Sequence, residues 1–139
     1  MNDNVFLDTN IFVYLYSEDE PEKQSIILDI LEQANCVTST QVLNEFCSVC
    51  LRKLKTPVNE VLQSIEEIRD NCELCYIDIE IIKKTLKLNS KYGYSYYDCL
   101  ILASALLNDC AYLYSEDMQH NQLIEETLKI INPFLSPSV

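Results

Sequence analysis

Apolar residues recur along the chain in two patterns, short continuous runs and longer stretches with helical spacing. Continuous runs are typical of strands buried on both faces of a sheet, whereas apolar residues three or four positions apart form one face of a helix. The runs predict strands at residues 4–8, 36–39, 74–77, 110–115 and 129–131. The helical spacing predicts helices at residues 10–16, 21–33, 79–91, 96–107 and 123–127, and two more that begin near Thr40 and at Pro57.

Several polar residues and one glycine mark the ends of these elements. Ser39 or Thr40, Asp78 and Ser95 stand just before helical patterns, where a side-chain oxygen can accept a hydrogen bond from a free backbone amide. Gly93 is the only glycine of the chain and interrupts the pattern between two predicted helices. We therefore expect a backbone turn at Gly93 that other residues adopt less readily.

Strands and helices alternate along most of the chain, and this alternation decides the fold class. It predicts an α/β domain in which helices cover both faces of a mostly parallel sheet. The length of 139 residues suits one domain, and nearly half of the residues are apolar, which is enough for a core. No linker, internal repeat or low-complexity stretch divides the chain. We predict one domain over residues 1–134 and a short tail at residues 135–139.

The chain is strongly acidic, with a formal net charge of −12 and a sequence pI of about 4.3. Proteins that neutralise many nucleic-acid phosphates usually carry a basic face. Two interpretations remain: the acids are concentrated in a metal pocket and on outer faces, or the protein does not bind nucleic acid. Most basic residues fall in two groups that could contact phosphate, although a solvated helix face is the simpler explanation for any single lysine. The groups are Arg52, Lys53 and Lys55, and Lys83, Lys84, Lys87 and Lys91.

The seven cysteines and the first residues of the chain bear on its compartment. The chain starts with an acidic segment rather than the basic start of a signal peptide, and no apolar stretch approaches the roughly 20 residues of a membrane span. We therefore expect a cytoplasmic protein with reduced, buried cysteines. Cys47-x-x-Cys50 and Cys72-x-x-Cys75 resemble zinc knuckles, but the first pair lies in a helical pattern and Cys75 in a strand, which disfavours a tetrahedral site.

Four acidic residues stand at the ends of predicted elements. Asp8 closes the first strand, and Asp117 follows the strand at 110–115. Glu45 and Asp98 lie in the first turns of helices. Because sites in open α/β sheets form at the carboxyl ends of the strands, all four can meet at one edge. Apolar neighbours and mutual repulsion make such carboxylates costly, and a bound Mg²⁺ or Mn²⁺ would remove that cost. Each acid alone also has a structural explanation, as a helix-start, turn or solvated residue.

Four short motifs resemble those of the PIN-domain family, in the same order and spacing over nearly the whole chain. They are Leu7-Asp8-Thr9-Asn10, Leu43-Asn44-Glu45-Phe46, the segment from Ser95 through Asp98 to Ala105, and Tyr114-Ser115-Glu116-Asp117. The resemblance implies a three-layer α/β/α fold with a central, mostly parallel sheet of four to five strands, a Mg²⁺ or Mn²⁺ site, and cleavage of RNA. Small members of this family are commonly VapC-type toxins, which form homodimers and are silenced by a cognate antitoxin protein.

The resemblance also implies roles for individual residues. The family's acidic quartet, which holds the metal and catalyses hydrolysis, is matched by Asp8, Glu45, Asp98 and Asp117. Its polar positions, which orient ligands or waters, are matched by Thr9, Asn10 and Ser115. Some members have a further acid where this chain has Gln119, so the number of metal ions stays open. His120, the only histidine, could act as a proton shuttle, but a surface role is the more natural expectation.

Other enzyme classes with an acidic strand end need residues that this chain lacks. A phosphatase of the haloacid-dehalogenase type needs a second Asp two positions after Asp8, where Asn10 stands. A receiver domain needs a lysine near the acids after a late strand, and residues 115–121 contain none. A phosphate-binding glycine loop is excluded by the single glycine. The alternative that remains is a catalytically silent PIN-like interaction module.

Overall fold

One mixed sheet of six strands runs through the computed structural model, which describes residues 3–135 of the chain. The strand order is β3-β2-β1-β4-β6-β5. Neighbouring strands are parallel except for β5, which is antiparallel to β6. The strands are β1 (Asn4–Leu7), β2 (Asn35–Ser39), β3 (Glu73–Cys75), β4 (Cys110–Tyr114), β5 (Leu123–Ile124) and β6 (Leu128–Ile131).

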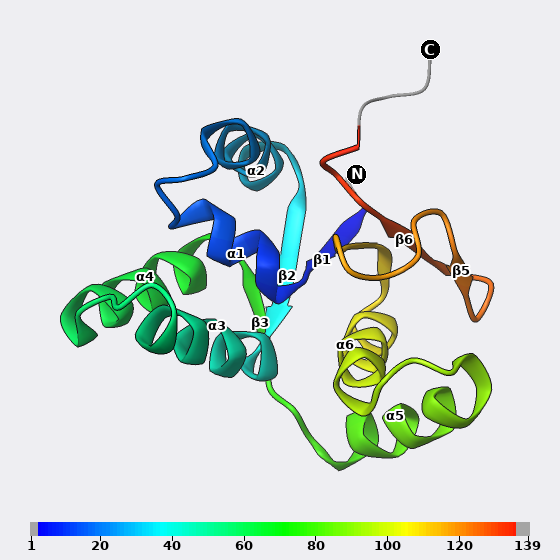
Figure 1. The fold of residues 1–139 in the computed structure, drawn as a ribbon. Coiled ribbons are helices and arrows are strands. Elements are labelled where there is room, and N and C mark those ends of the chain that lie inside the picture. The colour runs from blue at the N-terminus through cyan, green and yellow to red at the C-terminus, as the bar shows by residue number, and fades with distance from the viewer. Residues whose placement is uncertain (1–2, 136–139) are drawn as a thin grey trace.

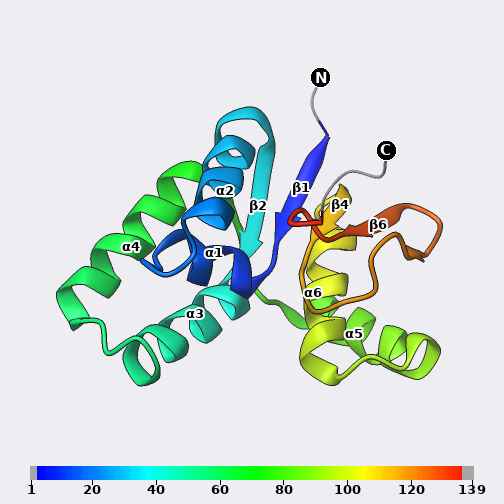
Figure 2. The same ribbon diagram turned by 45° about the horizontal axis from the view of Figure 1, so that its top comes forward.

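Helices cover both faces of this sheet, as Figures 1 and 2 show. The chain moves outward from β1 to β3 and then returns to β4, and right-handed crossovers in opposite directions place their helices on opposite faces. Helices α1 to α4 therefore lie on one face, and α5 and α6 on the other. This three-layer α/β/α arrangement confirms the predicted fold class. The helices are α1 (Thr9–Leu15), α2 (Pro21–Gln33), α3 (Thr40–Arg52), α4 (Val58–Asn71), α5 (Ile79–Tyr92) and α6 (Tyr96–Leu107).

The predicted helix starts are present as side-chain caps. Ser39, rather than Thr40, caps α3, while Asp78 caps α5 and Ser95 caps α6. In each case the side-chain oxygen accepts a hydrogen bond from the backbone amide three residues further on, at 3.0–3.2 Å. Gly93 ends α5 with a φ of 76°, in the left-handed region that glycine adopts without steric cost. These local signals fix where the helices meet the sheet.

The core is packed around β1, β4 and α6. Residues 99–105 of α6 are all buried, because this helix lies between the sheet and α5. Burying a large apolar side chain contributes about 1.5–3 kcal/mol, so this packing holds the end of β1 firmly against the neighbouring helices. The large side chains that are fully buried include Phe6, Phe12, Phe46, Leu102 and Leu113.

The segment predicted as a short helix at residues 123–127 is a β-hairpin instead. Strand β5 pairs with β6, with Ile124 opposite Leu128. Glu125 and Glu126 in the turn have φ angles of 49° and 65°, and two successive left-handed residues are typical of hairpin turns whose twist matches the strands. Apolar residues in so short a segment suit a strand as well as a helix, which is why the helix prediction was wrong. The sheet consequently has six strands rather than four or five.

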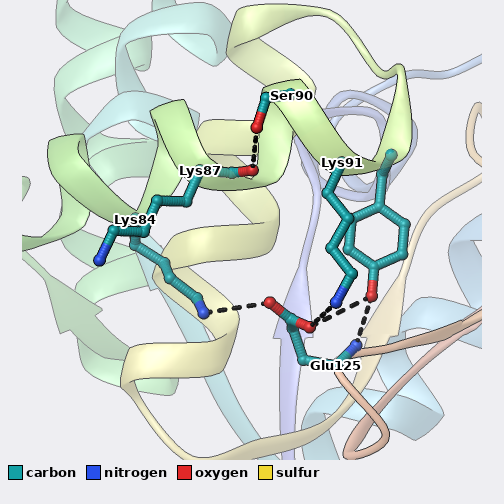
Figure 3. A network of polar contacts seen from close by, with 6 residues as sticks. Lys84, Lys87, Ser90, Lys91 and Glu125 are labelled. Carbon is teal, nitrogen blue, oxygen red and sulfur yellow. Dashed lines mark hydrogen bonds and ion pairs between the residues drawn. The ribbon is translucent and has the colours of Figure 1, made fainter.

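Glu125 fastens this hairpin to α5 (Figure 3). Its carboxylate accepts hydrogen bonds from Lys84 Nζ at 3.2 Å and Lys91 Nζ at 2.7 Å, and its backbone amide donates to the Tyr92 hydroxyl at 2.9 Å. Two lysines of the basic group on α5 are thus paired with an acid of the hairpin. Ion pairs at a protein surface add little stability, so the main effect of these two is to fix the position of the turn.

Some predicted boundaries differ slightly from the observed ones. The third strand, predicted at residues 74–77, is β3 at Glu73–Cys75. Apart from Leu135, the predicted tail at residues 135–139 lies outside the described residues. Within residues 3–135, no helix combines the length and the apolar character that crossing a membrane requires.

Candidate functional site

The carboxyl edge of the central strands gathers the predicted site residues. Strand β1 ends at Leu7 and Asp8 follows directly, while β4 ends at Tyr114 and Ser115 follows. The Asp8 amide donates a hydrogen bond to the Tyr114 carbonyl oxygen at 3.1 Å, so the pairing of β1 with β4 continues into the site. Figure 2 shows the beginning of α3 on one side of this edge and α6 on the other.

The four predicted acids line one cavity of about 280 Å³ at this edge. Segments far apart in the sequence contribute to its wall: the start of α1, one face of α3, the first turns of α6, and the loop after β4. The structure therefore brings the four acids together, while their roles in metal binding and catalysis stay predictions. The lining residues are Asp8, Thr9, Asn10, Glu45, Ser48, Val49, Arg52, Asp98, Ile101 and Asp117.

Asp8 is the most enclosed of the four acids, with 6% of its surface exposed. It caps α1, since its Oδ1 accepts a hydrogen bond from the Thr9 amide at 2.7 Å, and its Oδ2 accepts one from the Ser115 hydroxyl at 2.7 Å. The pKa of Asp8 is raised to about 6, mainly by burial. The two hydrogen bonds oppose this rise, and the negative charges of Asp98 and Glu45 add to it. Ionised Asp8 is therefore costly without a nearby cation.

Two further acids are held by the polar residues that the sequence singled out. The Thr9 hydroxyl donates to a Glu45 carboxylate oxygen at 2.6 Å, and the Asn10 side-chain amide donates to Asp117 Oδ2 at 2.6 Å. Ser115, besides holding the first acid, accepts a hydrogen bond from the Asp117 backbone amide at 3.3 Å. Each of the three polar residues therefore holds a different carboxylate in place.

Asp98 lies in the first turn of α6 and reaches the same cavity. Ser95 accepts a hydrogen bond from the Asp98 backbone amide at 3.2 Å, so the helix cap fixes the turn that carries this acid. Burial raises the pKa of Asp98, a separate side-chain hydrogen bond with Ser95 lowers it, and the negative charges of Asp117 and Glu45 raise it. The carboxylates from different segments are thus close enough to influence one another.

The oxygen atoms at this edge are suitable ligands for a hard divalent cation, although they are not arranged around a single ion position. No ion pair within residues 3–135 involves any of the four acids. Carboxylate, hydroxyl and amide oxygens are the ligands that Mg²⁺ and Mn²⁺ prefer. As the side chains stand, no three His, Cys, Asp or Glu residues of the described range are close enough together to hold one ion. Glu45 and Asp117 are hydrogen-bonded to Thr9 and Asn10 and would have to turn toward a cation.

Most of the chain matches the family model of the PIN domain, which covers residues 5–125 and therefore all four acids. The chain belongs to the PIN-domain family. This confirms the resemblance that the four sequence motifs indicated. No curated protein sequence matches the chain.

Solved structures with low sequence identity are similar to this PIN domain. A chain of a toxin–antitoxin complex from Klebsiella pneumoniae has a TM-score of 0.70 at 18% identity, over 94% of this chain and 98% of that one. The sarcin–ricin-loop-cleaving toxin VapC20 from Mycobacterium tuberculosis has a TM-score of 0.67 at 13% identity, over 81% and 89%. A chain of the DNA-bound VapBC2 complex from Rickettsia felis has a TM-score of 0.67 at 16% identity, over 93% and 99%. At these identities the similarity shows the fold alone.

Four residues that were not predicted as site residues also line the cavity of this PIN domain. Ser48, Val49 and Arg52 follow Glu45 by three, four and seven positions, which is the spacing of one helix face. This helical spacing is the feature of the sequence from which the three residues could have been predicted. Ile101 follows Asp98 by three positions and shares a helix face with it in the same way. Arg52 entered the prediction only as a member of a basic group. Among the described residues, it is the one basic side chain that lines this cavity.

The remaining candidates do not line the acidic cavity. His120 accepts a hydrogen bond from the Asn132 amide at Nδ1, at 2.9 Å, so its ring is engaged with the segment after β6. Gln119 is exposed, and neither residue lines the acidic cavity. Cys47 and Cys50 lie on α3 and Cys75 lies in β3, as predicted, while Cys72 stands between α4 and β3. The seven cysteines are free, and six of them are buried.

Proposed function

We propose that this PIN domain is a divalent-metal-dependent endoribonuclease that hydrolyses RNA phosphodiester bonds. One observation carries the proposal: four carboxylates from separate segments line one cavity, and none of them has a basic partner within residues 3–135. Holding such acids together costs stability, as the raised pKa of Asp8 reflects. A bound cation removes this cost, which is the behaviour expected of a metal site rather than of a structural cluster.

Side chains of this cavity would hold the metal ion. Mg²⁺ and Mn²⁺ fit because every candidate donor is an oxygen. When bound, the ion supplies Lewis-acid activation of the scissile phosphate and of the attacking water. Thr9, Asn10 and Ser115 are hydrogen-bonded to three of the carboxylates, and Glu45 and Asp117 would turn from two of these partners toward the ion. The ligands in this proposal are Asp8, Glu45, Asp98 and Asp117.

The proposal extends to a VapC-type toxin that is paired with an antitoxin protein. The similar solved structures belong to a toxin and to toxin–antitoxin complexes, and they match over most of the length of both chains. A protein partner would also find apolar surface on α2 and α4, where Leu28, Val58 and Leu62 are 55%, 64% and 60% exposed. A homodimer, which the family resemblance implies, is part of the same proposal and can be tested by light scattering.

A catalytically silent PIN-like interaction module is the second candidate. Two observations favour it: the net charge of −12 repels the RNA backbone, and no three acids of the described residues surround a common point. A silent module would bind no metal at this cavity and cut no RNA. The two candidates therefore differ in both metal binding and catalysis.

The test compares the wild-type protein with Asp8→Asn and Asp98→Asn. Each protein is incubated with fluorescein-labelled single-stranded RNA in Mn²⁺ or in EDTA, and its thermal unfolding is followed as Mn²⁺ is added. We expect fragments only from the wild type in Mn²⁺, with cleavage at least about 100-fold slower in both variants. Mn²⁺ should raise the unfolding temperature of the wild type but not of the variants. Asp29→Asn, which changes an exposed acid of α2, is the matched control and should behave as the wild type.

Three outcomes would contradict the proposal in different ways. Equal cleavage by wild type and Asp8→Asn would remove the active site from this cavity. Stabilisation by Mn²⁺ without cleavage would keep the metal site and reject the ribonuclease. The absence of both effects in the wild type would establish the silent module.

A further inference from the structure

Arg52 occupies a distinct place in the acidic cavity. It lies in the last turn of α3, on the helix face that also carries Glu45, Ser48 and Val49 into the cavity wall. Seven residues of helix rise about 10 Å, so Arg52 begins two turns away from Glu45. Helical side chains lean toward the N-terminus of their helix, which brings the guanidinium group back toward the acids.

The orientation of Arg52 is fixed from within α3. Its Nε donates a hydrogen bond to the Ser48 hydroxyl at 2.9 Å. Within residues 3–135 the two terminal nitrogens make no hydrogen bond, and Arg52 forms no ion pair although four carboxylates line the same cavity. One nitrogen of the guanidinium group is therefore hydrogen-bonded within α3, and the two terminal nitrogens can bind a ligand.

We propose that Arg52 binds a backbone phosphate of the RNA substrate at the mouth of the acidic cavity, an inference that rests on the proposed nuclease function. Four carboxylates and a net charge of −12 repel a polyanion, and a bound divalent ion offsets only part of that repulsion. The guanidinium fork matches two phosphate oxygens at once, which a lysine cannot reproduce. Arg52 thus supplies attraction where the rest of the cavity is negative.

The alternative, a purely structural role for Arg52, can be tested by comparison with a second arginine of the chain. A cation in the last turn of a helix interacts favourably with the helix dipole, and Arg52 stands there in α3. Arg69, the only other arginine, stands in the last turn of α4, is also exposed, and does not line the acidic cavity. Arg69→Ala therefore removes the same charge from an equivalent helix position without touching the cavity.

The experiment compares wild type, Arg52→Ala, Arg52→Lys and Arg69→Ala with fluorescein-labelled single-stranded RNA in Mn²⁺. We expect kcat/KM of Arg52→Ala to fall about tenfold or more, mainly through a higher KM, because a charge-assisted phosphate contact is lost. Arg52→Lys should recover part of this loss, and Arg69→Ala should match the wild type. The slope of log KM against log salt concentration should decrease by roughly 0.7 in Arg52→Ala, as expected for one lost phosphate contact on a single strand.

Mn²⁺ binding separates phosphate recognition from an indirect effect on the acids. Removing a cation beside four carboxylates should leave the thermal stabilisation of Arg52→Ala by Mn²⁺ equal to or larger than that of the wild type. A lost Mn²⁺ response in this variant would overturn the proposal, because Arg52 would then support the acids instead of the substrate. Equal KM values for Arg52→Ala and Arg69→Ala would overturn it while leaving the nuclease intact. Failure of the wild type to cleave RNA would reject the proposed function itself.

Discussion

The carboxyl group of Asp8 has a pKa of about 6 in the folded protein, compared with an ordinary value of 3.8, chiefly because it is buried. Above pH 6 the group is ionised in both the folded and the unfolded chain, and the fold bears the full cost of burying the charge. That cost is roughly 3 kcal/mol for a pKa raised from 3.8 to about 6. Between pH 6 and 4 the folded state takes up the proton first, so the cost declines and then vanishes.

Asp8→Asn should therefore stabilise the metal-free protein by up to about 3 kcal/mol at about pH 7.5, and the gain should disappear near pH 4. The asparagine oxygen can still accept from the Thr9 amide, and its nitrogen can donate to the Ser115 hydroxyl. Denaturant unfolding in EDTA at both pH values measures the effect. Asp29→Asn controls for the removal of one negative charge from an exposed site. A variant less stable than the wild type at neutral pH would contradict the cost of burying Asp8.

At the scale of elements, the sequence predicted the helices well because their ends are encoded by neighbouring residues. The bounds of α2 and α6 agree with the prediction, since Pro21 begins one and Ser95 caps the other. Strand β5 was missed because its two residues carry no period that separates a strand from a helix. Its conformation depends on pairing with β6 and on contacts of Glu125 with α5, which no local pattern records.

Replacement of Glu126 by glycine distinguishes the hairpin from the predicted helix. Glu126 has a φ of 65° and is exposed, so Glu126→Gly should stabilise the fold by about 0.5–1 kcal/mol by removing the steric cost of the left-handed conformation. Glu66→Gly, the same change on the exposed face of α4, should destabilise it by a similar amount. Urea unfolding of the two variants gives both values. Destabilisation by Glu126→Gly would indicate that the segment is helical after all.

At the scale of the whole molecule, the sequence indicated which acids can meet but not how they are held. The rule that strand ends share one edge of the sheet is enough to bring Asp8 and Asp117 together. The partners of the acids could not be predicted, because the Thr9–Glu45 hydrogen bond joins residues 36 positions apart and the Asn10–Asp117 bond joins residues 107 apart. The net charge also gives no indication that one arginine lines the cavity, because it sums the charges of the whole chain and not those of one site.

The same net charge of −12 governs how the free protein responds to salt. Only four ion pairs occur within residues 3–135, so most of the 22 acidic side chains repel one another through solvent. The Debye length falls from about 10 Å at 0.1 M to about 3 Å at 1 M, and adding NaCl should therefore raise the unfolding temperature of the metal-free protein at neutral pH by a few degrees.

RNA binding by the metal-loaded protein should weaken over the same salt range, because counterions compete for the phosphates. The two effects have opposite signs, so a salt-induced loss of RNA binding cannot be attributed to unfolding. Calorimetry near pH 4.3, the sequence pI, provides the control, since the net charge there is close to zero and salt should have little effect on stability. An unfolding temperature that stays constant or falls with salt at neutral pH would show that the acids are already compensated, which would also weaken the argument that the cavity needs a cation.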